Sequence, residues 1–247
     1  MNRHNIQSVT LRISVILFLI TFQAVLLLAE DKYAEDLTHS GPLQKYLDMT
    51  DRAAGTHNAS NIGLFFENRG KLYPRLLSYG PRGEFPINSG RNYIYRFSPM
   101  VGVAPDAATG RAANVIQSLW TQNEEWEAVG GFHNPSDTEI AFSDRPASWP
   151  NGDWLIQDED SEAVIYSSQD SYCVYNDANN TVEVLNIQIA QTGYAFGLDY
   201  AEDLLFFTFE ITNNSLNSYD SVYFAFYMDF DIGNLPGGVN EYTDDMI

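Results

Sequence analysis

Residues 204–245 read LLFFTFEITNNSLNSYDSVYFAFYMDFDIGNLPGGVNEYTDD. Apolar residues occupy every second position from Leu205 to Ile211, and aromatic or apolar residues recur at the same spacing in residues 222–230. A period of two is typical of a β-strand with one buried face. Because residues 213–218 are rich in Asn and Ser, which favour turns, we predict an antiparallel hairpin that presses both aromatic faces into a core.

Short runs of the same kind occur along most of the chain and are separated by turn signals. No stretch combines helix caps with a long apolar stripe, and residues 112–127 fit either a short helix or an irregular segment. The sequence therefore predicts an all-β fold with little helix, an antiparallel β-sandwich of the Ig-like or a related kind. The expected strands include residues 62–66, 92–97, 138–142, 163–166, 172–175 and 181–189.

The first 29 residues have the features of a secretory signal peptide. Arg3 and Arg12 accompany an apolar run that extends to Leu28, and Ala29 is a plausible cleavage residue. An uncleaved anchor is the alternative, although the run is short for a membrane span of ~20 residues. We therefore expect a secreted or cell-surface protein with no stable membrane span after signal cleavage.

The rest of the chain divides at about residue 60. Residues 30–60 are polar and mixed, which predicts an N-terminal arm or linker, and residues 61–247 form the expected β-rich domain. The final residues, 244–247, look like the start of another strand, so we expect this domain to be truncated at its C-terminal end.

Charge and cysteine content narrow the possible functions. The net charge is −20, with 33 acidic and 13 basic residues, which argues against nucleic-acid binding because phosphate needs a basic surface. An acidic surface suits a soluble extracellular protein or one that binds cations. The single cysteine, Cys173, excludes an intramolecular disulfide and is expected to be a buried, unreactive thiol.

An acidic loop follows the second aromatic run. Calcium takes six to eight oxygen ligands from carboxylates, amides and carbonyls, and a strand projects alternate side chains from one face. The sequence therefore offers a structural calcium site, with a solvated acidic loop as the alternative. Its candidate ligands are Asp229, Asp231, Asn234, Asp244 and Asp245.

Signatures of catalysis are scarce, which favours a binding function over an enzymatic one. The sequence contains no G-x-S-x-G, H-E-x-x-H, P-loop or G-x-G-x-x-G motif. Tryptophans beside acids and amides suggest stacking on sugar rings, and Trp149 and Trp154 are the main candidates, with Trp120 and Trp126 as further ones. The alternative is that these tryptophans belong to the core or anchor loops.

Several short motifs together resemble the N-terminal region of large uncharacterised secreted proteins of Bacteroidetes-like bacteria, which often end in a type IX secretion sorting domain. The resemblance covers about residues 60–247 and implies export, a β-rich body and further domains after residue 247, but no known reaction. No sorting tail occurs in this sequence. The motifs are Asn68-Arg69-Gly70 with Tyr93-Ile94-Tyr95, residues 154–160 (WLIQDED), Asp177, residues 211–215 (ITNNS), residues 229–233 (DFDIG) and Asp244-Asp245.

Two functions follow from these observations. The first is a non-catalytic secreted or cell-surface module that serves structure, adhesion or contact with glycans or cell-surface components, stiffened by calcium. The alternative is an accessory N-terminal domain of an extracellular hydrolase that acts on polysaccharide or protein.

Overall fold

The structure is a computed structural model of residues 1–247. It describes residues 10–18, 51–73, 79–106, 110–118, 125–180 and 184–230, and for residues 10–18 it describes the backbone only. The strands are β1 (Thr10–Phe18), β2 (Ala54–His57), β3 (Gly63–Glu67), β4 (Arg82–Glu84), β5 (Ile94–Val103), β6 (Asn114–Ile116), β7 (Glu127–Ala128), β8 (Ala141–Phe142), β9 (Gln169–Asn176), β10 (Ile187–Ala195), β11 (Leu204–Asn213) and β12 (Val222–Phe230).

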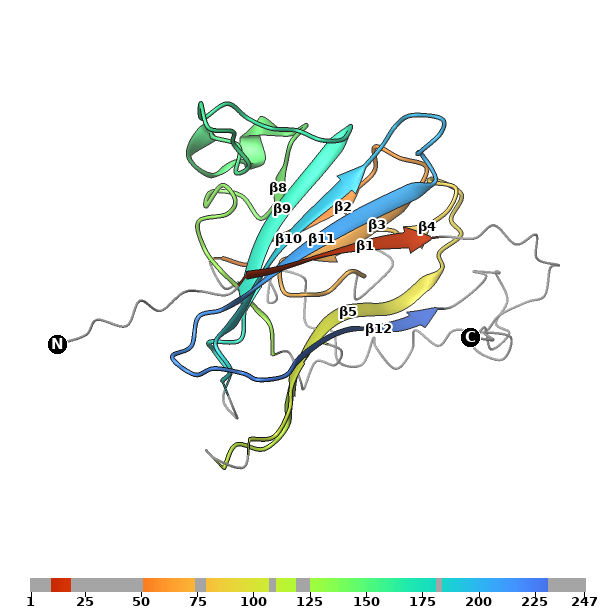
Figure 1. The fold of residues 1–247 in the computed structure, drawn as a ribbon. Coiled ribbons are helices and arrows are strands. Elements are labelled where there is room, and N and C mark those ends of the chain that lie inside the picture. The colour runs from red at the N-terminus through yellow and green to blue at the C-terminus, as the bar shows by residue number, and fades with distance from the viewer. Residues whose placement is uncertain are drawn as a thin grey trace.

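The described strands form one large sheet and two small ones. The large sheet has the order β1-β11-β10-β9-β7, and β8 also pairs with β9. The small sheets have the orders β12-β5-β6 and β2-β3-β4. Every pairing between named strands is antiparallel. Figure 1 shows the large sheet lying against the small ones, so the predicted antiparallel β-sandwich is confirmed.

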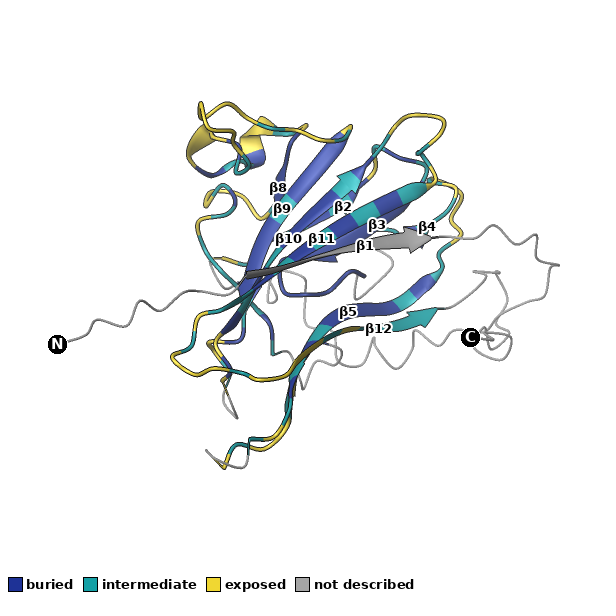
Figure 2. Ribbon diagram, viewed as in Figure 1, coloured by how far each residue is buried: buried dark blue, intermediate teal, exposed yellow. Residues whose placement is uncertain are grey.

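Aromatic side chains fill the space between the layers. Phe207 and Phe209 of β11 point inward with 2% and 1% exposure. The ring of Phe207 lies 6.2 Å from that of Phe66 in β3, and the ring of Phe209 lies 5.2 Å from that of Phe226 in β12. One strand of the large sheet therefore packs against both small sheets, and Figure 2 shows the alternating buried residues of β11.

The predicted hairpin of β11 and β12 is wrong, although the predicted inner face of β11 is confirmed. β11 pairs with β10 and β1, whereas β12 pairs with β5 in the opposite layer. The connection contains the expected turn, in which the Ser215 N–H donates to Asn213 Oδ1 at 2.9 Å. That turn carries the chain from one layer to the other, so the two aromatic faces meet across the core instead of lying side by side.

Other expectations need smaller corrections. Residues 163–166, which were expected to form a strand, lie in a loop. Ala163 makes only an isolated bridge with Gln157. The folded body begins before residue 61, since β2 pairs with β3 and His57 is fully buried. Within residues 112–127, where the sequence left a short helix and an irregular segment open, residues 114–116 form strand β6. In the described part of the chain, no helix combines the length and apolar character needed to cross a bilayer.

Candidate tyrosine-lined binding site

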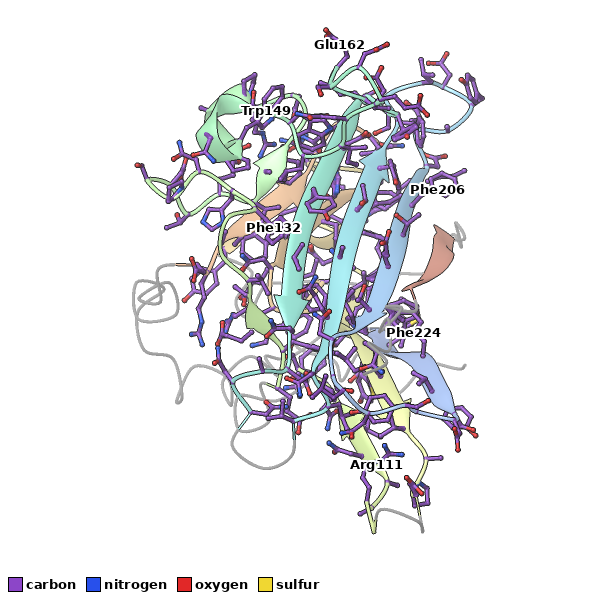
Figure 3. The ribbon with its side chains drawn as sticks, turned by 60° about the vertical axis from the view of Figure 1, so that its left-hand side comes forward. Arg111, Phe132, Trp149, Glu162, Phe206 and Phe224 are labelled. Atoms are coloured by element: carbon purple, nitrogen blue, oxygen red, sulfur yellow. The ribbon has the colours of Figure 1, made fainter. Side chains whose placement is uncertain are left out.

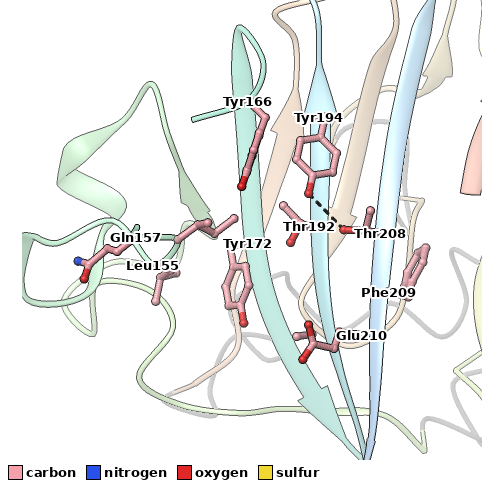
Figure 4. Close-up of a pocket in the computed structure, with 11 residues that line it drawn as sticks. Leu155, Gln157, Tyr166, Tyr172, Thr192, Tyr194, Thr208, Phe209 and Glu210 are labelled. Carbon is pink, nitrogen blue, oxygen red and sulfur yellow. Dashed lines mark hydrogen bonds between the residues drawn. The ribbon is translucent and has the colours of Figure 1, made fainter. Parts of the chain in front are cut away.

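A cavity of about 620 Å³ lies on the outer face of β9, β10 and β11, on the side of the large sheet away from the core (Figure 4). Its floor comes from alternate residues of these strands, and its wall comes from the loop that precedes β9. The volume falls within the ~300–1,000 Å³ that is common for small-molecule sites. The lining residues are Leu155, Ile156, Gln157, Tyr166, Tyr172, Ala190, Thr192, Tyr194, Thr208, Phe209 and Glu210.

The strand register explains the hollow. Thr192 of β10 stands between Tyr172 of β9 and Thr208 of β11, so these three residues form a row across the sheet. In the next row Ala190 stands beside Glu210. Cross-strand partners share a face, so Ala190, Thr192 and Thr208 form a floor of small side chains that is bordered by the larger Tyr172 and Glu210.

The wall of the cavity is a loop anchored by tryptophan. Trp154 is 2% exposed, and its indole Nε1 donates a hydrogen bond to the carbonyl oxygen of Val164 at 2.9 Å. The Val164 N–H in turn donates to the carbonyl of Ile156 at 2.9 Å. The Trp149 ring lies 5.6 Å from the Trp154 ring, on the loop side of the sheet (Figure 3). This packing fixes Leu155 and Ile156 beside the strands.

Asp170 joins the end of this loop to β9. The carboxylate is fully buried and accepts hydrogen bonds from the backbone N–H groups of Tyr166 and Ser167, at 2.7 and 2.9 Å. The Asp170 backbone N–H donates to Ser143 Oγ at 2.8 Å. Tyr166, which is 60% exposed, is therefore held at the rim of the cavity by a buried side chain of the sheet.

The tyrosines present both rings and hydroxyl groups to the cavity. The Tyr166 ring meets that of Tyr194 edge-on at 6.0 Å, and the Tyr194 hydroxyl lies 3.3 Å from Thr208 Oγ1. Burial, followed by the nearby Cys173 and Glu210, raises the pKa of Tyr172 to about 12. The Tyr172 hydroxyl is therefore protonated at neutral pH and can both donate and accept hydrogen bonds.

Two of the tryptophans that the sequence suggested for stacking are buried. Trp154 is buried and Trp149 is half-buried, with its Nε1 donating to the carbonyl of Phe142 at 2.7 Å. Trp126 is also fully buried, and Trp120 lies outside the described residues. Trp154 is too deeply buried to stack on a sugar ring, and its contacts fit the other interpretation, in which the tryptophan anchors a loop.

Only one of the five proposed calcium ligands, Asp229, lies among the described residues. Asp229 lies in β12 opposite Arg96 of β5 and is half-buried. Asp231, Asn234, Asp244 and Asp245 lie outside the described residues, so the calcium site stays a prediction. Within the described ranges, no group of three or more His, Cys, Asp or Glu side chains is placed to hold a metal ion.

A second polar cluster, missed from the sequence, lies inside the sandwich. His57 Nε2 is 2.8 Å from Ser171 Oγ, and His57 Nδ1 is 3.1 Å from Gln169 Oε1. This arrangement resembles a serine nucleophile with its base. However, all three residues are at most 1% exposed, so a substrate cannot reach the serine. The three side chains of the cluster satisfy one another's polar groups inside the core. The thiol of Cys173 is buried as predicted, and burial raises its pKa.

Comparison of the chain with protein-family models, with curated proteins and with solved structures finds no match. The function of the chain is therefore inferred from the cavity and its side chains.

Proposed function

We propose that this chain is a secreted or cell-surface β-sandwich module that binds glycans in the tyrosine-lined cavity without catalysing a reaction. The observation that carries the proposal is the combination of aromatic rings with hydroxyl, amide and carboxylate groups around one hollow. A sugar has apolar C–H faces and a rim of hydroxyl groups. Rings bind the first and convergent polar groups bind the second.

The chemistry of the lining favours binding over reaction. Tyr172, Thr192 and Thr208 offer neutral hydroxyl groups in one cross-strand row, and Gln157 and Glu210 offer an amide and a carboxylate. These groups recognise a polyhydroxylated ligand through hydrogen bonds in both directions. Export to a place where glycans occur is supported by the apolar leader of the sequence and by the strongly acidic composition.

Tyr166 gives the most direct test, because it is exposed and its removal leaves the core intact. The full chain is first screened on a glycan array, and its best ligand is then titrated by calorimetry. We expect Tyr166→Ala to weaken binding about tenfold, which corresponds to ~1.4 kcal/mol. Tyr223→Ala is the matched control, because Tyr223 is 64% exposed on β12 in the opposite layer.

A second variant probes the floor of the cavity. Thr192→Val removes one hydroxyl group at nearly constant volume, and Thr192 is only 7% exposed. We expect weaker binding, because a hydroxyl group that can bond to the ligand is lost while the aromatic rings remain in place. The proposal fails if the array shows no ligand, or if Tyr166→Ala and Thr192→Val bind as tightly as the unmodified chain.

A further inference from the structure

The outer edge of β11 is covered by β1, the segment that the sequence predicts to be part of the export leader. All nine residues of β1 pair with β11, from Thr10 opposite Thr212 to Phe18 opposite Leu204 (Figure 1). Without β1, β11 would end the sheet with a row of unpaired backbone groups. A long apolar edge of this kind is a template for pairing with another strand.

The register matches two alternating patterns. Four apolar residues of β1 stand opposite the four buried residues of β11, and three polar or charged residues stand opposite the polar ones. The apolar pairs are Leu11 with Ile211, Ile13 with Phe209, Val15 with Phe207 and Leu17 with Leu205. The polar pairs are Thr10 with Thr212, Arg12 with Glu210 and Ser14 with Thr208. The alternation ends there, because Ile16 and Phe18 stand opposite the half-buried Phe206 and Leu204.

Over residues 10–15 this alternation is more regular than an export leader requires. The apolar region of a leader requires overall hydrophobicity, whereas an edge strand over a core requires apolar residues at every second position. A slip of one residue would place Arg12 and Ser14 opposite buried positions of β11, so the pattern also fixes the register. Arg12 opposite Glu210 adds a pair of opposite charges across the strands.

We propose that the edge of β11 is a strand-acceptor site and that residues 10–18 are its built-in occupant. The N-terminal segment closes the large sheet for as long as it remains attached to the chain. Cleavage after Ala29 would remove the occupant and open an edge that accepts an extended segment with apolar residues at alternate positions. This inference does not depend on the glycan-binding proposal, because it concerns the edge and not the outer face.

Two neighbouring lysine substitutions test the occupant in the full chain. Val15→Lys places a charge opposite the buried Phe207, and Ser14→Lys places the same charge opposite the half-buried Thr208. We expect Val15→Lys to lower the melting temperature and to accelerate amide hydrogen exchange in residues 204–213 by tenfold or more. Ser14→Lys should leave both unchanged. Equal behaviour of the two variants would overturn the proposal, since this register places Val15 opposite a buried residue and Ser14 opposite a half-buried one.

Disulfide trapping gives an independent measurement in case Val15→Lys does not fold. Thr10→Cys with Thr212→Cys joins two residues that stand opposite each other, and Thr10→Cys with Thr208→Cys is the out-of-register control. The control positions are separated by roughly four residues of ~3.4 Å each, which is beyond disulfide reach. We expect rapid cross-linking within one chain for the first pair only. Absence of that bond, or a bond between two chains, would overturn the assignment of a built-in occupant.

Discussion

Acidification should destabilise this protein through one buried histidine. His57 is fully buried, and its Nδ1–H donates to Gln169 Oε1 while Nε2 accepts from the Ser171 hydroxyl. Its ring stacks on Phe66 at 5.4 Å. Burial and the positive charge of Arg145 lower the pKa of His57 to about 3, against the opposing effect of the Gln169 hydrogen bond. The folded protein therefore holds the neutral imidazole.

The expected magnitude follows from proton linkage. The pKa of the histidine is 6.5 in its ordinary state and about 3 in the folded protein. Between these values the unfolded chain binds a proton that the folded chain does not bind, so the free energy of unfolding falls as the pH falls. The loss is about 1.4 kcal/mol for each pH unit, or roughly 2 kcal/mol between pH 6.5 and about pH 5. Above pH 6.5 this contribution to stability is fully present.

Urea unfolding at a series of pH values measures this loss. His57→Gln removes the titrating ring, so its unfolding free energy should depend less steeply on pH between 6.5 and 5 than that of the unmodified chain. The comparison concerns slopes, because the variant also loses packing at every pH. His133→Gln is the comparison variant: His133 is also buried, and burial lowers its pKa against the opposing charges of Asp51 and Asp137, so we expect it to flatten the pH profile less than His57→Gln does. Parallel pH profiles for the unmodified chain and His57→Gln would refute the reasoning.

Three further predictions concern the core, the cavity rim and the acidic loop. Gly193→Ala should cost about 1–3 kcal/mol of unfolding free energy, because the added Cβ would lie 2.4 Å from a buried imidazole nitrogen; Gly102→Ala, whose Cβ meets nothing within 3.4 Å, should have a far smaller effect in the same urea titration. Asp170→Ala should lower stability by about 1–3 kcal/mol and weaken glycan binding, since it releases two backbone N–H groups that position Tyr166. Millimolar calcium should raise the melting temperature relative to EDTA, and Asp229→Asn should abolish the shift; an unchanged melting temperature would leave the acids as surface charge.

The faces of individual strands could be predicted from sequence, because local alternation determines them. The inner positions of β11 and of residues 185–189 were predicted from their period of two, and Leu205, Phe207, Leu185 and Ile187 are all buried. The burial of Cys173 was predicted from its residue type and is confirmed at 3% exposure.

The partners of the strands could not be predicted in the same way. A polar turn between two amphipathic strands fits both a hairpin and a crossing between layers, and only the rest of the fold decides. β12 pairs with β5, which lies more than a hundred positions earlier in the chain, and this choice fills the small sheet that faces β11. Such long-range pairing leaves no local signal in the sequence.

The cavity was missed for the same reason. Tyr172, Thr192 and Thr208 come from three strands, and only the register aligns them in one row. The signal that could have indicated the site is the run of Thr192 and Tyr194 at outward positions of β10, next to the inward Gly193. The sequence prediction instead named Trp154, which anchors the wall of the cavity and does not line it.

β11 connects the two proposals because each of its three sides has a different role. Its inner residues, such as Phe207, pack across the core. Its outer residues Thr208 and Glu210 line the cavity, and its backbone edge pairs with β1. Inward residues of β11 thus contribute to stability, and its outward residues contribute to the proposed binding site. Thr208→Val should therefore affect glycan binding while leaving the exchange of the β11 backbone protected. Val15→Lys should expose that backbone, and any loss of glycan binding that accompanies it would show that the N-terminal segment also maintains the shape of the cavity.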